Sequence, residues 1–110
     1  MRVHLIKRRP IEDFTEKHSL SKNAFNIWLS LIKSADWVIP GDIQATFGSA
    51  DLLGNGYDRV VFNIGANKYR LICSYLFGNK QVHLFVCWIG THAEYTELCK
   101  KGHQYTVSIS

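Results

Sequence analysis

The sequence predicts a small α+β fold, in which an antiparallel sheet carries an N-terminal helical hairpin packed on one face. Residues 59–89 contain three runs of alternating residues separated by tight turns, the pattern of a three-stranded meander. Residues 10–34 instead repeat their apolar side chains at helical spacing, and a short helix is predicted to follow the meander. A short alternating strand precedes the first helix at residues 3–7. The predicted order is therefore β-α-α-β-β-β-α.

Composition indicates one globular domain with a polyanionic partner. The 110 residues suffice for one core, so we expect a single domain over 1–110, with 100–110 as a flexible basic tail. The net charge of +4 fits RNA, DNA or an acidic protein segment. The three cysteines show no C-x-x-C spacing, and no apolar run reaches the ~18 residues of a membrane span. We therefore expect a soluble protein that stays in the reducing cytoplasm, with no membrane partner.

The N-terminal half is predicted to supply the helices. Pro10 suits the first turn of a helix that we expect to end near Ser19. Ser21 is a candidate N-cap of a second helix, and Asp42 a candidate N-cap of a short one through Phe47. Residues 52–58 are rich in turn formers and are predicted to form a surface loop. The second helix has an apolar stripe for packing on the sheet: Ala24, Ile27, Trp28, Leu31 and Ile32.

The meander is the part of the chain that suggests a function. Residues 60–72 are predicted as two strands around a two-residue turn, at 65–66 or 66–67. Lys68 and Arg70 stand two apart in the second strand, so their side chains share a face. With the turn at 65–66, Asn63 would lie opposite Lys68, and Val60, Phe62, Tyr69 and Leu71 would form the other, apolar face. We expect all helices on the other side, and this face to be exposed with the side chains of Arg59, Asn63, Lys68, Arg70 and His83.

The third strand, residues 81–89, is aligned by a second turn at Gly78-Asn79. This alignment places Val82, Leu84, Val86 and Trp88 on the core face. It places His83, Phe85 and Cys87 on the face of Lys68 and Arg70, which would also expose Ile72.

A last helix is predicted to begin after Thr91, which with Glu94 has the spacing of a capping box. His92 and Tyr95 are three residues apart and share a helical face. Both side chains can transfer protons near the cations, although a His with a Tyr is also common in ordinary cores.

Two readings of the basic face remain open on this evidence. Basic residues interleaved with aromatic ones form the usual platform for single-stranded nucleic acid, whereas a solvated sheet face also carries charges. The five histidines show no metal-binding spacing, and there is no glycine-rich phosphate loop. We therefore expect no metal and no cofactor.

Four segments together carry a resemblance that covers most of the chain. They are Ala35-Asp36-Trp37, Ser49-Ala50-Asp51-Leu52-Leu53-Gly54, Arg59 to Leu71, and Gly90-Thr91-His92-Ala93-Glu94-Tyr95. In order and spacing the sequence resembles the HigB family, toxins of bacterial type II toxin–antitoxin systems that are related in fold to RelE. The resemblance implies a metal-independent endoribonuclease that cuts mRNA in the A site of the translating ribosome.

The resemblance also implies roles for the candidate residues. Lys68 and Arg70 would stabilise the charge of the phosphorane, and His92 and Tyr95 would transfer protons. Which of His92, Tyr95 and Lys68 is the acid and which the base stays open. RNA binding is assigned to Arg59, Asn63, Asn67, His83 and Thr91.

The implied partner is a HigA-type antitoxin with a helix-turn-helix domain, and DNA would be bound only through the antitoxin complex. How the antitoxin docks is left open. Two other functions remain alternatives: a non-catalytic RNA- or ribosome-binding module, and an inactive toxin kept as the antitoxin's partner. The sequence also departs from the family at Ala66, which stands where a glycine is common.

Overall fold

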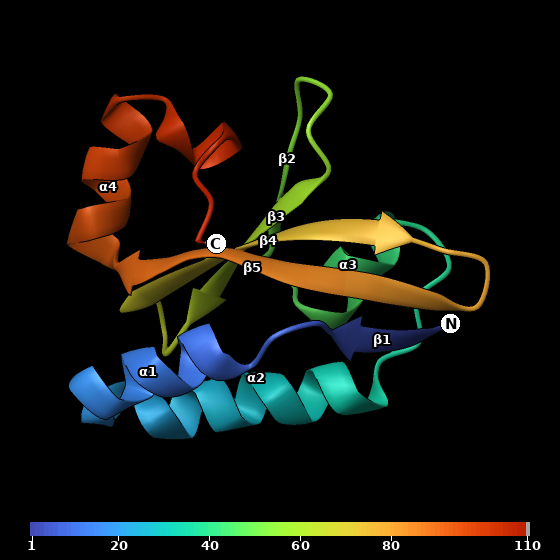
Figure 1. Cartoon of the computed structure of the whole chain (residues 1–110), viewed down its shortest axis with the longest axis horizontal. Helices are drawn as coiled ribbons and strands as arrows, with labels where there is room; N and C mark the ends of the chain where they lie inside the picture. The colour runs from blue at the N-terminus through green and yellow to red at the C-terminus, as the bar shows by residue number, and fades with distance from the viewer. Residues whose placement is uncertain (110) are drawn as a thin grey trace.

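The computed structural model describes residues 1–109 and contains one five-stranded sheet in the order β1-β5-β4-β3-β2 (Figure 1). The first strand runs parallel to the last, and the other neighbours are antiparallel. The α+β class is confirmed, but the sheet is mixed and the loop predicted at 52–58 begins inside a strand. The strands are β1 (Arg2–Leu5), β2 (Asp51–Leu53), β3 (Arg59–Ile64), β4 (Tyr69–Phe77) and β5 (Gln81–Thr91).

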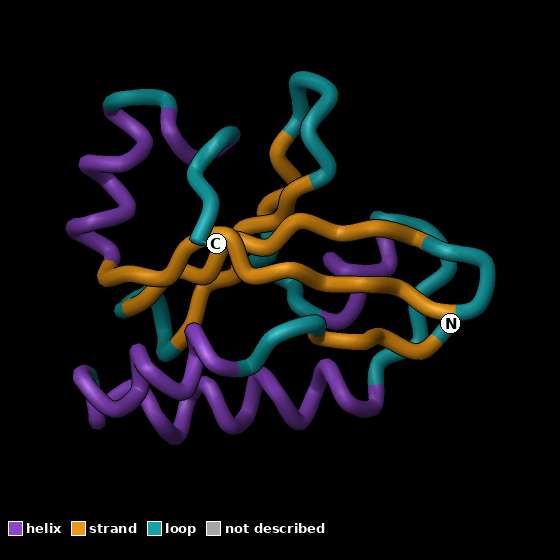
Figure 2. The backbone as a smooth tube through the Cα atoms, viewed as in Figure 1, coloured by secondary structure: helices purple, strands orange, loops and turns teal. Residues whose placement is uncertain are grey.

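Helices cover both faces of this sheet (Figure 2). The predicted helical hairpin is confirmed, and its two helices lie side by side against one face. The expectation that all helices share that side is wrong, because the last helix packs on the opposite face. The helices are α1 (Arg9–Lys17), α2 (Lys22–Ser34), α3 (Gly41–Thr46) and α4 (His92–Lys100), with short 3₁₀ turns at η1 (Ser19–Ser21) and η2 (His103–Tyr105).

The sheet therefore has a core on each side. The larger core lies under α1 and α2, where Phe25 and Trp28 of α2 meet Phe62 of β3 and Leu71 of β4. The smaller core lies on the other face, between the sheet and the C-terminal part of the chain. Its members are Leu53, Val61, Ile72 and Cys87, with Trp88, Tyr95, Leu98, Tyr105 and Val107 packed against them.

Two predicted N-caps act differently from expectation. The Ser21 hydroxyl donates to the carbonyl of His18 at 2.6 Å and does not cap α2. Asp42 lies inside α3, and its carboxylate accepts the backbone N–H groups of Val38 and Ile39 at 2.7 and 3.1 Å. These two bonds lower the pKa of Asp42. Both side chains thus bond to the main chain just ahead of their own positions, which secures the turn that enters each helix.

The hairpin between β3 and β4 has a longer turn than predicted. Its four residues are 65–68, and Asn63 pairs with Arg70, so Asn63 does not lie opposite Lys68. Three consecutive residues have positive φ: Gly65 at 64°, Ala66 at 53° and Asn67 at 73°. Because Lys68 closes this turn, it stands outside β4, and the expected pair of cations on one strand does not form.

The predicted alignment of β5 is wrong from Trp88 onward, because the strand contains a β-bulge. Ile72 pairs with Trp88 and Cys73 with Val86, which leaves Cys87 as the extra residue. The extra residue reverses the alternation beyond it. Trp88, predicted for the larger core, therefore belongs to the smaller core on the face of Arg70.

Within the segment 100–110, expected to be a flexible basic tail, the described residues make contacts with the sheet. Tyr105 and Val107 pack in the smaller core. The Arg59 guanidinium donates to the carbonyls of Gln104 and Val107 at 3.3 and 2.7 Å. These contacts hold residues 104–107 against β3 and β4. None of the helices in residues 1–109 is both long and apolar enough to cross a lipid bilayer.

Candidate functional site

The candidate site is centred on Arg70, at the end of the sheet where β4 begins and β5 ends. Arg70 is 9 % exposed, and its Nη1 donates to the carbonyls of Asn67 and Tyr69 at 2.9 and 3.1 Å. Its guanidinium carbon lies 5.8 Å from the ring centroid of Tyr95 on α4, within cation–π range. Arg70 is thus held rigidly by the turn that precedes it and by the helix that covers it.

Tyr95 is the half-buried partner of Arg70. Burial, above all, raises the pKa of the Tyr95 phenol well above its usual value, and the neighbouring Cys99 thiol and the Asp51 carboxylate add to this effect. The positive charge of Arg70 opposes it. The phenol is therefore protonated at neutral pH and is available as a hydrogen-bond donor.

Trp88 completes the packing around this pair. Its ring centroid lies 6.1 Å from that of Tyr95, with the two planes inclined at 46°. The indole also lies directly over Gly90, where a Cβ would come within 2.3 Å of it. Gly90 pairs with Arg70 across the strands. The missing side chain at Gly90 therefore makes room for the ring that supports Tyr95.

The first turn of α4 brings His92 to the same end of the sheet. The capping box is confirmed: the Thr91 hydroxyl accepts the N–H of Glu94 at 3.2 Å, and the Glu94 carboxylate accepts the N–H of Thr91 at 2.8 Å. The N–H of His92 donates to the carbonyl of Lys68 at 3.0 Å. The main chains of Lys68 and His92 are therefore adjacent, and both side chains are exposed.

Asn63 and Asn67 stay close to Arg70, but each has a structural contact. Asn63 pairs with Arg70, and its amide donates to the carbonyl of Ser49 at 3.0 Å. Asn67 adopts φ of 73° in the turn and supplies one of the carbonyls that hold Arg70. Both residues therefore fix the shape of the turn at the site.

The remaining predicted residues, Arg59 and His83, lie elsewhere. Arg59 is bound to the C-terminal segment, as described above. His83 pairs with Leu76, six residues along β4 from Arg70, which corresponds to roughly 20 Å at the rise of a strand. The structure thus gathers Lys68, Arg70, His92 and Tyr95 and leaves these two outside.

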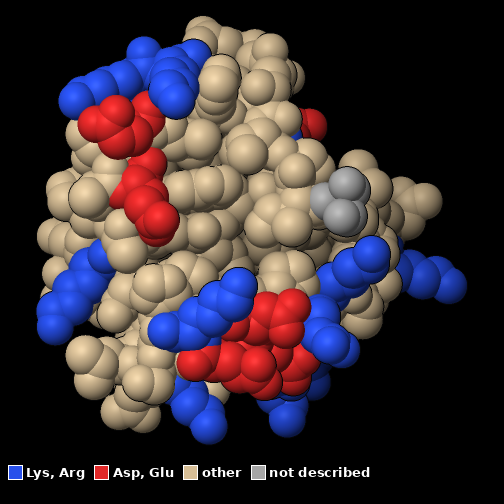
Figure 3. All heavy atoms as spheres, turned by 60° about the vertical axis from the view of Figure 1, so that its left-hand side comes forward, with Lys and Arg blue, Asp and Glu red and all other residues tan. Residues whose placement is uncertain are grey.

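The expected open basic face is absent from the part of the chain that the structure describes. Ile72 and Cys87, predicted to be exposed on it, are buried under α4 and the C-terminal segment. Figure 3 brings forward the side with α4 and α1, where Lys and Arg form separate groups and acidic side chains adjoin two of them. Within residues 1–109, no group of three His, Cys, Asp or Glu side chains is placed to hold a metal ion.

Sequence reasoning missed two residues of this site, Trp88 and Asp51. Trp88 was assigned to the wrong face because the bulge at Cys87 was not foreseen. Asp51 has no role in the sequence prediction, although it pairs with Val61 in β2 and its charge helps to raise the pKa of Tyr95. A signal was present for Trp88, since a large aromatic residue two positions before Gly90 has space to cover that glycine.

Comparisons with known proteins match most of this chain. The family model described as "HigB_toxin, RelE-like toxic component of a toxin-antitoxin system" matches residues 21–98, which include all four gathered residues. A curated protein of Escherichia coli O6:H1, named mRNA interferase HigB, is 29 % identical over 98 residues. That alignment covers 89 % of this chain and 93 % of the relative.

Proposed function

The chain belongs to the HigB family, RelE-like toxins of toxin–antitoxin systems, and we propose that it is an endoribonuclease that cuts mRNA on the translating ribosome in the cytoplasm. The observation that supports this proposal is the cluster of Lys68, Arg70, His92 and Tyr95 at one end of the sheet. The relative's name, mRNA interferase, supports the choice of mRNA as substrate.

The cluster has the groups that cleavage by the RNA's own 2′-OH requires. One group removes the 2′-OH proton while the oxygen attacks phosphorus, cations stabilise the charged phosphorane, and another group protonates the leaving 5′-oxygen. Lys68 is exposed and Arg70 is fixed, so we assign both to charge stabilisation. Because burial keeps Tyr95 protonated, we assign it to hydrogen-bond or proton donation, and His92 to the other proton transfer.

We propose that this reaction needs no metal. The ends of the product distinguish the two chemistries. Attack by the 2′-OH leaves a 2′,3′-cyclic phosphate and a 5′-hydroxyl, whereas attack by a metal-bound water on phosphorus can leave a 5′-phosphate. The proposed partner is a HigA-type antitoxin that neutralises the toxin, and contacts with DNA are assigned to the antitoxin.

The function is tested by inducible expression in a bacterial host, with mapping of mRNA 5′ ends. We expect growth arrest and new in-frame cuts with 5′-hydroxyl ends for the wild type. His92→Ala and Lys68→Ala change exposed side chains, so each should keep the fold and reduce cleavage by about 10²-fold or more. The matched controls are His103→Ala and Lys80→Ala, which alter exposed residues of the same types outside the cluster.

Each other outcome has a distinct meaning. Growth arrest without mRNA cuts would indicate a ribosome-binding inhibitor and contradict the enzyme proposal. Absence of growth arrest would indicate an inactive toxin. Equal loss of cleavage in the His103→Ala control would show that His92 has no special role. Arg70→Ala is less informative alone because Arg70 is buried, so its folding must be checked by circular dichroism.

A further inference from the structure

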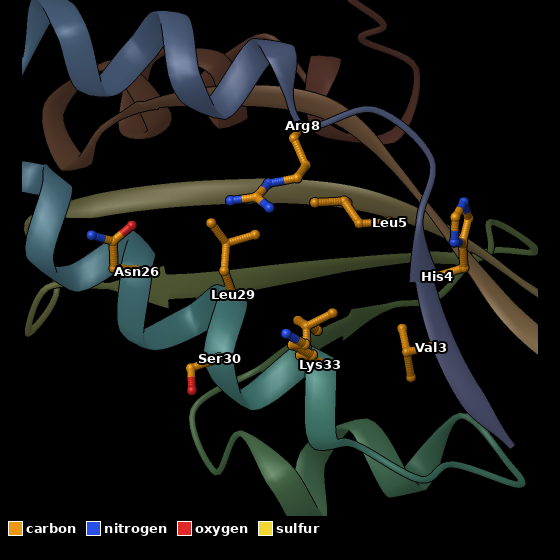
Figure 4. A pocket seen from close by; sticks show the side chains of 9 residues that line it. Val3, His4, Leu5, Arg8, Asn26, Leu29, Ser30 and Lys33 are labelled. Carbon is orange, nitrogen blue, oxygen red and sulfur yellow. The ribbon is translucent and has the colours of Figure 1, made fainter.

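A groove lies beside β1, on the face of the sheet opposite the candidate site (Figure 4). Its volume is about 530 Å³, and it lies between β1, α2 and the loop that leads into α1. Val3 and Leu5 of β1 and Leu29 of α2 give it apolar walls. From Asn26 to Lys33 the groove follows eight residues of α2, about 10 Å at the helical rise, which matches roughly three residues of extended chain.

Within residues 1–109, the edge of β1 next to this groove is only partly paired. β1 is the outermost strand, and the N–H of Ile6 donates inward to Leu84 of β5. Because alternate residues of a strand direct their N–H and C=O groups to opposite sides, those of Val3 and Leu5 point outward. Within residues 1–109, no main-chain group on that side accepts the N–H of Leu5.

This edge already accepts a short piece of the chain itself. Arg2 forms an antiparallel bridge with Asp36, and the N–H of Trp37 donates to the carbonyl of Met1 at 2.9 Å. The bridge occupies the N-terminal end of β1, ahead of the unpaired N–H of Leu5. The edge of β1 is thus able to pair with an added strand. Its C-terminal half, around Leu5, remains unoccupied by the described chain.

The charges of the groove select an acidic ligand. Arg8 extends into it from one side, and Lys33 lines it from the last turn of α2 (Figure 4). No lining residue is acidic, and neither Arg8 nor Lys33 takes part in an ion pair of the described chain. The lining has no Phe, Tyr or Trp, and His4 is its only aromatic side chain, so nucleic-acid bases would find little stacking surface there.

We propose that this groove binds an extended segment of a partner protein, in which aliphatic residues are flanked by acidic ones. The segment adds as a sixth strand beside β1, its aliphatic side chains face Leu5 and Leu29, and its carboxylates meet Arg8 and Lys33. This proposal does not depend on ribonuclease activity, because none of these residues belongs to the candidate site.

The probe is a fluorescent peptide of sequence Glu-Glu-Val-Thr-Val-Glu-Glu, and its binding to the full-length protein is followed by anisotropy. The comparison ligands are the same peptide with Lys in place of Glu, and a seven-nucleotide oligouridylate. Arg8→Glu with Lys33→Glu should weaken binding of the acidic peptide by about tenfold or more. Lys22→Glu with Lys101→Glu makes the same change in net charge at exposed residues outside the groove, and should have little effect.

Amide hydrogen exchange tests the mode of binding separately. Saturating acidic peptide should slow exchange of the Leu5 N–H about tenfold or more. Four results would overturn the proposal: equal weakening by the two double variants, equal binding of the Lys peptide, displacement of the acidic peptide by oligouridylate at lower concentration, or unchanged exchange at Leu5.

Discussion

Adding one methyl group at Gly90 tests whether Trp88 supports the candidate site. In Gly90→Ala the new Cβ would lie 2.3 Å from Cη2 and 2.5 Å from Cζ2 of Trp88. Carbon atoms pack best at about 3.5–4.0 Å, so the indole has to move by more than 1 Å. Glu94 Oε1, which accepts the Thr91 N–H in the capping box, would be 3.1 Å away, and a shift of a few tenths of an ångström relieves that contact. The conflict is therefore between Gly90 and Trp88.

The expected cost is that of an overpacked site. Such insertions cost about 1–3 kcal/mol, and we expect about 2 kcal/mol here because Tyr95 backs the Trp88 ring. In a domain of this size that change lowers the melting temperature by roughly 10 °C. RNA cleavage should also fall in Gly90→Ala, because a displaced indole no longer holds Tyr95 against Arg70.

The assay is thermal unfolding of a double-mutant cycle with Trp88→Ala. Once the ring is absent, Gly90→Ala should change stability by no more than about 0.5 kcal/mol. If Gly90→Ala costs the same with and without the Trp88 ring, the steric argument fails and the supporting role of Trp88 fails with it.

Two further predictions concern Tyr95 and Ala66. Because the pKa of Tyr95 is raised, the folded protein keeps a proton that the unfolded chain loses above pH ~10. The free energy of unfolding should therefore decline from about pH 10 upward. This decline should be less steep in Tyr95→Phe. Urea unfolding at about pH 8 and pH 11 measures this, and an identical decline in both proteins would contradict the assignment. Ala66→Gly relieves a left-handed φ of 53° and should raise stability by roughly 0.5 kcal/mol, whereas the control Ala93→Gly in α4 should lower it by about as much or more. A loss of stability in Ala66→Gly would show that the turn is unstrained.

Local patterns were sufficient for the elements whose contacts lie nearby in sequence. Alternation correctly placed Phe62 and Leu71 in the core, and the spacing of Thr91 and Glu94 correctly identified the cap of α4. The β3–β4 register was missed because the turn holds a non-glycine residue, Ala66, in the left-handed region, which sequence rules do not anticipate. The bulge at Cys87 and the parallel pairing of β1 depend on contacts with distant parts of the chain.

The position of α4 was missed although the sequence contained a clue. The face that we expected to be exposed included Ile72 and Cys87, and an apolar face of this kind needs a cover. We expected an RNA partner to supply that cover. The chain supplies it itself, because the reversal of alternation after Cys87 and the capped turn at Thr91 direct α4 onto that face.

The covered face changes what the site can do with RNA. An open sheet with several exposed cations would bind single strands along its length, but here Arg70 is buried and Arg59 is bound to the chain end. Lys68 and His92 at the rim are the exposed members of the cluster. Two exposed groups provide little phosphate affinity for free RNA, whereas Arg70 and Tyr95 are held in place for the roles proposed for them at one phosphate. A site that is preorganised for reaction but binds free RNA weakly requires another macromolecule to position its substrate. This is the physical argument for the proposed dependence on the ribosome.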